Sequence, residues 1–190
     1  MKKTAALLFV TLLFGFNLTA RANEFSMRAA PQLGVLGMIS DAALHAAASR
    51  VNFVSEFHME YQIVSRWFAT ASFHHLYFFG NRADHMNVFA PAAGVKMVSF
   101  EDVAASGDFF DKTRWWFEIE GGPYIHQARF AAVIPRGTQT DLGFSFGAGF
   151  DTLFHKRWAA GFQTKMHTVF YGPDNYILLH FGPHLMFRFY

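Results

Sequence analysis

The stretch YILLHFGPHLMFRFY, residues 176–190, alternates between apolar and polar side chains. One face of an extended chain would carry Ile177, Leu179, Phe181, Leu185, Phe187 and Phe189. The opposite face would carry Tyr176, His180, Gly182, His184, Met186 and Arg188. A period of two residues is typical of a β-strand whose two faces meet different surroundings. The stretch therefore predicts a strand rather than a helix.

The same alternation recurs throughout the chain. It is clear in residues 53–63, 115–126, 142–154 and 158–170, and less regular in residues 26–39, 67–79 and 88–99. Residues 67–79 are apolar on both faces, and Pro91 and Gly94 interrupt residues 88–99. With the last stretch these segments predict eight strands, and only the alanine-rich residues 42–48 favour a helix. After residue 22 no apolar run approaches the roughly 18 residues of a transmembrane helix.

The first 22 residues have the features of a Sec signal peptide. Two lysines precede an apolar stretch from Ala5 to Phe16, and Ala20-Arg21-Ala22 provides a small-x-small cleavage site. A membrane anchor is the alternative, but about a dozen apolar residues are too short to span a bilayer. We expect a signal peptide at 1–22 and a mature domain at 23–190. Cleavage would remove three of the 16 basic residues and change the net charge from +2 to −1.

The composition excludes several classes of protein. The chain has 190 residues, 25 of them phenylalanine, and no cysteine. So apolar a chain, with only 16% charged residues, cannot be disordered. The absence of cysteine excludes a disulfide framework, a thiol nucleophile and a cysteine zinc site. Because the basic balance belongs to the export signal, it gives no support to nucleic-acid binding.

Aromatic residues gather near the predicted strand ends. Arg66-Trp67, Arg114-Trp115 and Arg157-Trp158 each stand at a turn-to-strand junction. We expect one interfacial aromatic belt of Trp67, Trp115, Trp116 and Trp158, and a second of Tyr77, Tyr124, Tyr171 and Tyr176. Such belts mark the two surfaces of a membrane. Aromatic core residues in a soluble barrel are the alternative, but these would not gather the tryptophans at one rim.

The polar faces of the strands carry charges of both signs. A dry core could not hold so many ions, whereas the lumen of a membrane barrel could. We predict an all-β, eight-stranded antiparallel up-and-down transmembrane β-barrel. Its glycine-dense faces, around Gly121, Gly122, Gly147 and Gly149, would leave room for bulky neighbours. The predicted lumen polar network consists of Arg28, Glu56, His58, Glu60, Lys96, Glu118, Glu120, Asp151, Lys165, His167 and Arg188.

The mature chain resembles the small eight-stranded outer-membrane β-barrels of Gram-negative bacteria, the OmpA-like or OmpX-like group. The resemblance is carried by Gly121-Gly122-Pro123-Tyr124, residues 144–151, Lys156-Arg157-Trp158 and residues 185–190. It implies Sec export to the cell outer membrane and an assembly signal at Phe187, Phe189 and Tyr190, with Tyr190 out of phase. Implied partners are outer-membrane lipids, lipopolysaccharide and the barrel-assembly machinery. We expect a monomer that binds no nucleic acid.

The resemblance also assigns the connections to the two sides of the membrane. Short turns at 64–66 and 155–157 would face the periplasm. External loops would span 40–50, 80–87, 131–139 and 172–175. The connection at 101–112 would be a long periplasmic one carrying four acidic residues. It could bind a cation or a partner, but a solvated acidic loop is the simpler interpretation.

The ten histidines do not indicate a metal site. Neighbouring His74 and His75 would point to opposite faces of a strand. His180 and His184 would stand about 13 Å apart, too far for one ion. Glu56, His58 and Glu60 share a face, where a hydrogen-bond network explains them better. We expect no metal and no cofactor.

An enzyme is the least favoured of three functions. Lipid A 3-O-deacylases are barrels of this size that use a His-x-Ser motif, but in His167-Thr168-Val169 a valine stands at the serine position. No amphipathic N-terminal helix supports a similarity to the palmitoyl-transferring barrel. The favoured function is a structural or interaction barrel, and a narrow small-solute channel is the second hypothesis.

Overall fold

Eight long strands make up most of the described chain. The computed structural model describes residues 24–39, 51–79, 85–99, 108, 112–128, 137–171 and 174–189. No helix in these ranges has the length and apolar character needed to cross a membrane. In chain order the strands are β1 (Phe25–Ile39), β2 (Val51–Val64), β3 (Trp67–Phe79), β4 (His85–Val98), β5 (Thr113–Ala128), β6 (Gly137–His155), β7 (Trp158–Tyr171) and β8 (Asp174–Phe189).

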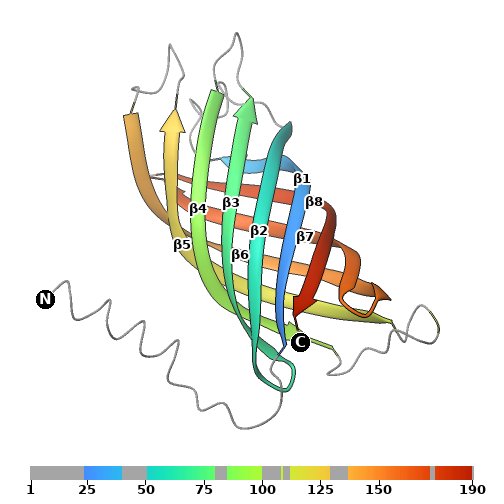
Figure 1. Ribbon diagram of the computed structural model, residues 1–190. Coiled ribbons are helices and arrows are strands. Elements are labelled where there is room, and N and C mark those ends of the chain that lie inside the picture. Colours follow the sequence, from blue (N-terminus) through green and yellow to red (C-terminus); the bar gives the residue numbers. More distant parts are fainter. Residues whose placement is uncertain are drawn as a thin grey trace, which may run out of the picture.

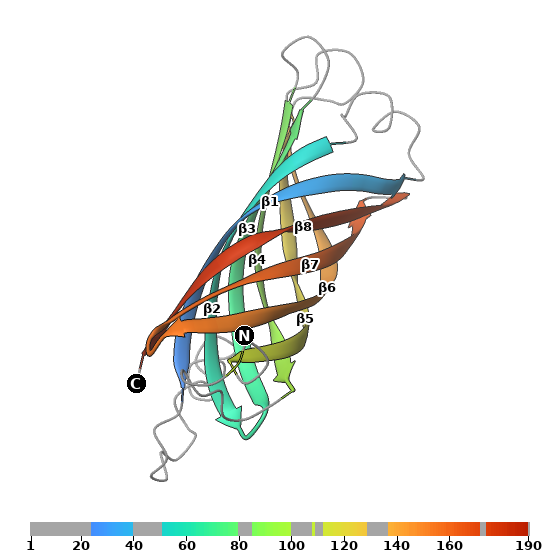
Figure 2. The same ribbon diagram turned by 90° about the vertical axis from the view of Figure 1, so that its right-hand side faces the viewer.

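The strands form a closed barrel in sequence order. Each strand pairs antiparallel with the next, and β1 pairs with β8 from Phe25↔Phe189 to Ile39↔Tyr176. Figures 1 and 2 show the tilted strands winding around a common axis, with the end of β8 beside the start of β1. Closure leaves no strand edge unpaired, which is the only arrangement of a sheet that can cross a bilayer. The prediction of an all-β, eight-stranded antiparallel barrel is confirmed.

Side chains alternate between the inside and the outside of the barrel. In β2, Phe53 and Phe57 are exposed, whereas Glu56 and His58 are buried. Successive Cβ atoms of a strand point to opposite faces, so each strand contributes one apolar outward row and one inward row. Exposed large apolar side chains are found on the outward rows of all eight strands. The outside of the barrel therefore carries an apolar coat contributed by every strand.

Pro91 and Gly94 do not interrupt the sheet. Strand β4 runs through both of them, with Pro91 pointing outward. The ladder between β4 and β5 passes from Phe89↔Ile125 directly to Ala93↔Gly121. Pro91 has no backbone N–H, and no hydrogen bond from it to β5 is needed at this point. Gly122 of β5 lies against the Pro91 carbonyl, where a Cβ atom would not fit. A close backbone approach explains this glycine.

The strands extend further than the sequence pattern predicted. Two-residue turns at Ser65–Arg66 and Lys156–Arg157 match the predicted short turns, and Ser65 has a positive φ of 46°. At the other end, β4 begins at His85, β6 at Gly137 and β8 at Asp174. The predicted external loops therefore include residues that belong to strands. Polar residues such as Thr138 and Gln139 pair with β5 because ladder hydrogen bonds do not require apolar side chains.

Several predicted features lie outside the described residues. These are the signal peptide at 1–22, the segment 40–50 with its expected helix, most of the acidic connection at 101–112, Tyr190, and residues 80–84, 131–136 and 172–173 of the other predicted external loops. Of that connection the structure describes Asp108 and Lys112, whose backbones form a 3.3 Å hydrogen bond.

Candidate functional site

The predicted lumen residues all lie on inward rows. Each is 6% exposed or less, and several are fully buried. They come from β1, β2, β4, β5, β6, β7 and β8. They are Arg28, Glu56, His58, Glu60, Lys96, Glu118, Glu120, Asp151, Lys165, His167 and Arg188. The interior of the barrel is therefore the candidate functional site.

Arg28 connects opposite walls of the barrel. Its Nη2 atom lies 3.2 Å from Glu56 Oε1 on the neighbouring strand β2. The same atom lies 3.1 Å from Glu118 Oε2 on β5, which is four strands away around the barrel. Strands β1 and β5 lie on opposite sides of the barrel, and both side chains are fully buried. The ion pair therefore crosses the lumen instead of running along its wall.

Lys165 forms a second bridge at the same level. From β7 its Nζ atom lies 3.1 Å from Glu56 and 3.0 Å from Glu120. Its distance to Glu118 is 2.5 Å. Buried charges are tolerated when each has several opposite partners and hydrogen bonds, whereas an unpaired one is very costly. Arg28, Lys165 and their carboxylates therefore stabilise one another as a unit.

A second cluster lies nearer the chain termini. Lys96 is 2.8 Å from Glu60 and 3.6 Å from Asp151. Arg114 is 3.3 Å from Asp151, and His184 Nε2 is 2.6 Å from the same carboxylate. These contacts continue the polar layer from the middle of the lumen toward the lower end, which we define as the end where residues 24 and 189 lie.

Glu24 completes the lower mouth of the lumen. It lies 2.6 Å from Arg188 and 3.2 Å from Arg114. Neither Glu24 nor Arg114 was among the predicted lumen residues. Arg114 could have been found, because it precedes the outward Trp115 and strand alternation then turns it inward. Glu24 lies before the first strand, where no alternation exists to orient it.

Three of these residues have the spacing of a metal site. Ligand atoms of Glu56, His58 and Glu118 all lie within 4.8 Å of one another. However, Arg28 Nη2 contacts all three, at 3.2 Å, 3.1 Å and 3.1 Å respectively. The guanidinium lies where a metal ion would have to bind. The positive charge that this carboxylate pair requires is supplied by the chain itself.

In the half of the lumen farther from Glu24 the inward rows are largely apolar, which corrects the prediction of an interior filled by polar side chains. Ten buried residues form one cluster there, and β3 contributes Leu76 and Phe78 from its inward row. Residues 67–79 are not apolar on both faces as expected, because Thr70, Ser72 and His74 also point inward; Leu76 and Phe78 at the end of the strand were the sequence signal for this cluster. Its members are Val54, Leu76, Phe78, Met86, Val88, Ala90, Tyr124, Val169, Tyr176 and Leu178.

Tyrosine and histidine side chains join the apolar cluster to the charged layer. The Tyr124 hydroxyl lies 2.5 Å from His167 Nδ1, and His167 Nε2 lies 2.5 Å from His180 Nε2. His180 in turn forms a hydrogen bond with Gln32, whose amide donates to Glu56 over 3.3 Å. These links give the buried phenol and imidazoles partners between the two layers.

The aromatic belts are only partly as predicted. Trp67, Trp115 and Trp158 point outward and are 47%, 49% and 37% exposed. Trp116 is instead fully buried in the lumen, since consecutive strand residues face opposite sides. Arg28 and Lys96 lie over its ring, 4.5 Å and 4.6 Å from the centroid, as in cation–π contacts.

The tyrosines divide in the same way. Tyr77 points outward, whereas Tyr124 and Tyr176 are 1% exposed inside the barrel. The prediction that these two belong to an interfacial belt is wrong. Their hydroxyl groups find buried partners, His167 and His126, which a lipid-facing position would not offer. The side chain of Tyr171 lies outside the described residues.

Glycines of β6 make room for the large inward residues of β5. A Cβ atom on Gly149 would lie 2.6 Å from the Trp116 ring, and one on Gly147 would lie 2.8 Å from Glu118 Cγ. Both distances are shorter than packed side chains allow. The glycine-rich pattern of β6 is therefore matched to the bulky residues paired with it.

The histidine motif of β7 is not arranged as a lipid-facing catalytic site. His167 and Val169 are fully buried on the inward row, and Thr168 lies on the outward row. Lipid around a barrel would contact its outward rows. His167 is turned away from that surface.

Comparison with solved structures gives a consistent result. The chain matches surface protein A of Neisseria with a TM-score of 0.63 and 8% identity, over 89% of this chain and 98% of that one. It matches OprG of Pseudomonas aeruginosa at 0.54 and 9%, over 90% and 97%. It matches Ail, the attachment invasion locus protein of Yersinia pestis, at 0.52 and 10%, over 88% and 100%.

This chain has the fold of the small outer-membrane barrels. At these identities the likeness concerns the fold alone. No family model matches the sequence, and no curated protein matches it either. The small outer-membrane barrel fold accounts for the apolar outer coat and the eight-strand closure. The fold does not define the role of the filled lumen, which depends on the residues inside it.

Proposed function

We propose that the protein is an integral outer-membrane barrel with a structural or interaction role and a lumen that does not conduct. Two bridges across the lumen carry this proposal: Arg28 with Glu118, and Lys165 with Glu56. An eight-stranded barrel is only wide enough for its own side chains to fill. Here the charged bridges fill the middle, and the apolar cluster around Leu76 and Phe78 fills the outer end.

The apolar outer surface of the barrel supports the proposed membrane location. An exposed apolar coat of this extent on a soluble monomer would cause aggregation. From Trp67 to Tyr77 is ten residues, which is about 33 Å along a strand and about 25 Å along the axis at a tilt of about 40°. That height equals the apolar band of outer-membrane barrels. The outward tryptophans would lie at the periplasmic surface, beside the two-residue turns and the described chain ends.

The first experiment tests the membrane location. Cell fractions containing the full chain are compared by gel electrophoresis in detergent, with and without boiling. We expect the protein in the outer-membrane fraction and a mobility that changes on boiling, because a closed barrel resists detergent until heated. A soluble periplasmic protein without a heat-dependent shift would refute the proposal.

The second experiment tests the closed lumen. The purified barrel is reconstituted in planar bilayers, with a large porin as the positive control for insertion. We expect no single-channel steps from the barrel. Ohmic steps would favour a small-solute channel instead.

An enzyme that modifies lipid A receives no support from the β7 motif, since His167 faces the lumen and Val169 has no nucleophilic group. Mass spectrometry of lipid A with and without expression checks this. An altered acylation pattern would contradict the proposed structural role.

A further inference from the structure

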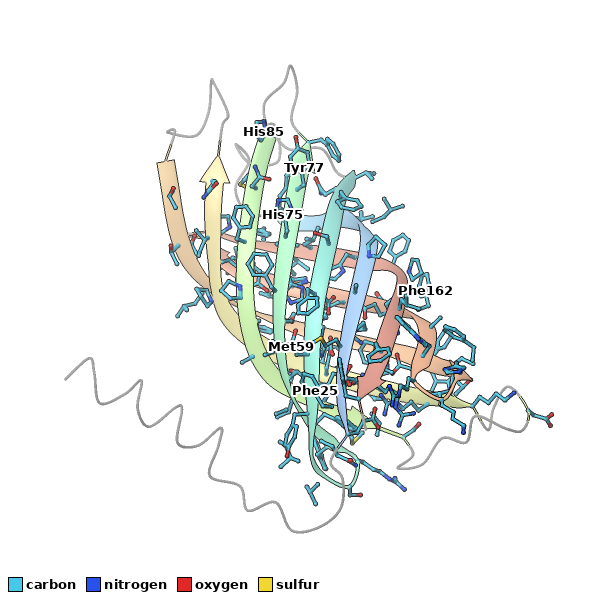
Figure 3. The ribbon with its side chains drawn as sticks, viewed as in Figure 1. Phe25, Met59, His75, Tyr77, His85 and Phe162 are labelled. Carbon is cyan, nitrogen blue, oxygen red and sulfur yellow. The ribbon has the colours of Figure 1, made fainter. Side chains whose placement is uncertain are left out.

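A small polar patch interrupts the apolar coat of the barrel. On β3 and β4 the outward rows carry His75, Tyr77, His85 and Asn87, which we call the β3–β4 patch. Figure 3 labels three of them near the end of the barrel that is farthest from the chain termini. Six other histidines of the described chain are buried, namely His58, His74, His126, His167, His180 and His184. His75 and His85 instead face the surroundings.

The side chains of the patch are held in place by one another. His75 Nε2 forms a 2.8 Å hydrogen bond with Asn87 Oδ1, and its ring stacks on Phe89 at 4.9 Å with an angle of 8°. Tyr77 stacks on His85 at 5.8 Å with an angle of 19°. Rings that are already ordered lose little conformational entropy when they bind a ligand. The patch is therefore preorganised.

The depth of the patch corresponds to the outer headgroup boundary. Tyr77 is paired with Asn87, and Asn87 with the exposed Gln127, so a polar row crosses three strands at this level. His75 lies two residues lower, about 5 Å nearer the membrane centre at the same tilt. Polar and ionisable groups facing hydrocarbon are costly and mark functional sites unless a partner compensates them. His75 and Asn87 compensate each other in part, and at this depth a lipid headgroup is a further partner within reach.

We propose that the β3–β4 patch binds the phosphorylated sugar headgroup of an outer-leaflet glycolipid, the chemistry that lipopolysaccharide presents. Imidazole N–H groups are donors suited to phosphate oxygens. Asn87 offers both an amide donor and an acceptor to sugar hydroxyls. Tyr77 offers an apolar ring face with a polar tip, the combination that suits a membrane boundary. The inference rests on the proposed outer-membrane location, but not on the closed lumen.

The test compares two variants in nanodiscs. The double variant His75→Phe/His85→Phe keeps the aromatic stacking and removes the imidazole donors. His155→Phe, at the end of β6 beside the turn 156–157, is the matched control. The probes are phosphorylated lipopolysaccharide, the same lipopolysaccharide after dephosphorylation, and phosphatidylglycerol, each titrated and counted by native mass spectrometry. Loss of the imidazole groups of His75 and His85, and with them of hydrogen bonds to charged phosphate oxygens, should weaken binding of the phosphorylated form by about tenfold or more.

The expected result is weaker binding of phosphorylated lipopolysaccharide by the double variant only, with equal binding of the dephosphorylated form by all three proteins. Equal binding of the phosphorylated form would overturn the proposal. Equal competition by phosphatidylglycerol would overturn it too, because the patch would then be a general anion site. Both failures leave the membrane location intact if the heat-dependent gel shift persists, so they are distinguishable from failure of the proposed function.

Discussion

The guanidinium of Arg28 lies 3.1 Å from the carboxylate of Glu118 on the far side of the barrel. The pair connects the first strand with the fifth, and no solvent reaches either side chain. Removing Arg28 would leave the buried carboxylates of Glu56, Glu118 and Glu120 to share Lys165.

We predict that Arg28→Met destabilises the barrel by about 3–5 kcal/mol, as expected when one partner of a buried ion pair is deleted. Urea unfolding in lipid vesicles measures the effect. Arg157→Met, in an exposed turn, is the control and should change stability by less than about 0.5 kcal/mol. The double variant Arg28→Met/Glu118→Gln should recover part of the loss. Strict additivity of the two single changes would show that the pair is not coupled.

Gly149 and its neighbour Ala148 give a second test. A side chain at position 149 would press on the Trp116 ring, whereas Ala148 faces the outer coat. We expect Gly149→Leu to cost about 1–3 kcal/mol by overpacking. Ala148→Leu should be nearly neutral because it adds apolar surface to a lipid-facing row. Equal losses in the two variants, measured by the same unfolding assay, would contradict the inward placement of Trp116.

Tryptophan fluorescence separates the two faces of β5. In a chain that keeps only Trp115, lipids brominated on their acyl chains should quench the emission strongly. In a chain that keeps only Trp116, the same lipids should quench it little, since that indole lies in the lumen between Arg28 and Lys96. The remaining tryptophans are replaced by phenylalanine in both variants. Strong quenching of Trp116 would place its ring outside the barrel.

Orientation in the membrane can be measured directly because the chain has no cysteine. Thr138→Cys, at the start of β6, should react with a membrane-impermeant maleimide on intact cells. Lys156→Cys, in the turn after β6, should react only after the outer membrane is disrupted. Reaction of Lys156→Cys on intact cells would mean that the short turns face outward.

Strand periodicity was sufficient to predict most of the fold. Phe189 and Arg188, or Phe57 and Glu56, face the sides that a period of two assigns to them, because successive side chains of a strand point to opposite faces. Strand ends were less predictable, since Thr138 and Gln139 are polar yet pair with β5. Backbone pairing at the rims is independent of the apolar signal that identifies strands.

The interior was predictable in its charges but not in its layers. A charged residue on an inward row can be found from alternation alone, as for Lys165 and Glu120. Which charges meet depends on the barrel geometry, which brings Arg28 to Glu118 from strands that are not neighbours. The misplacement of Trp116, Tyr124 and Tyr176 had a different cause. Residue type suggested a membrane boundary, whereas strand phase turned these rings inward.

The bridge from Arg28 also constrains how the barrel is assembled. Arg28 belongs to β1, the strand that must pair with β8 to close the sheet. Until that seam forms, Glu118 and Glu120 are lined along an open sheet without the cation from the first strand, and they require water. Closure of the seam both completes the backbone ladder and supplies the missing guanidinium. The pairing of β1 with β8 that completes the backbone ladder therefore also brings Arg28 to the carboxylates of β5, so the seam and the interior are completed together.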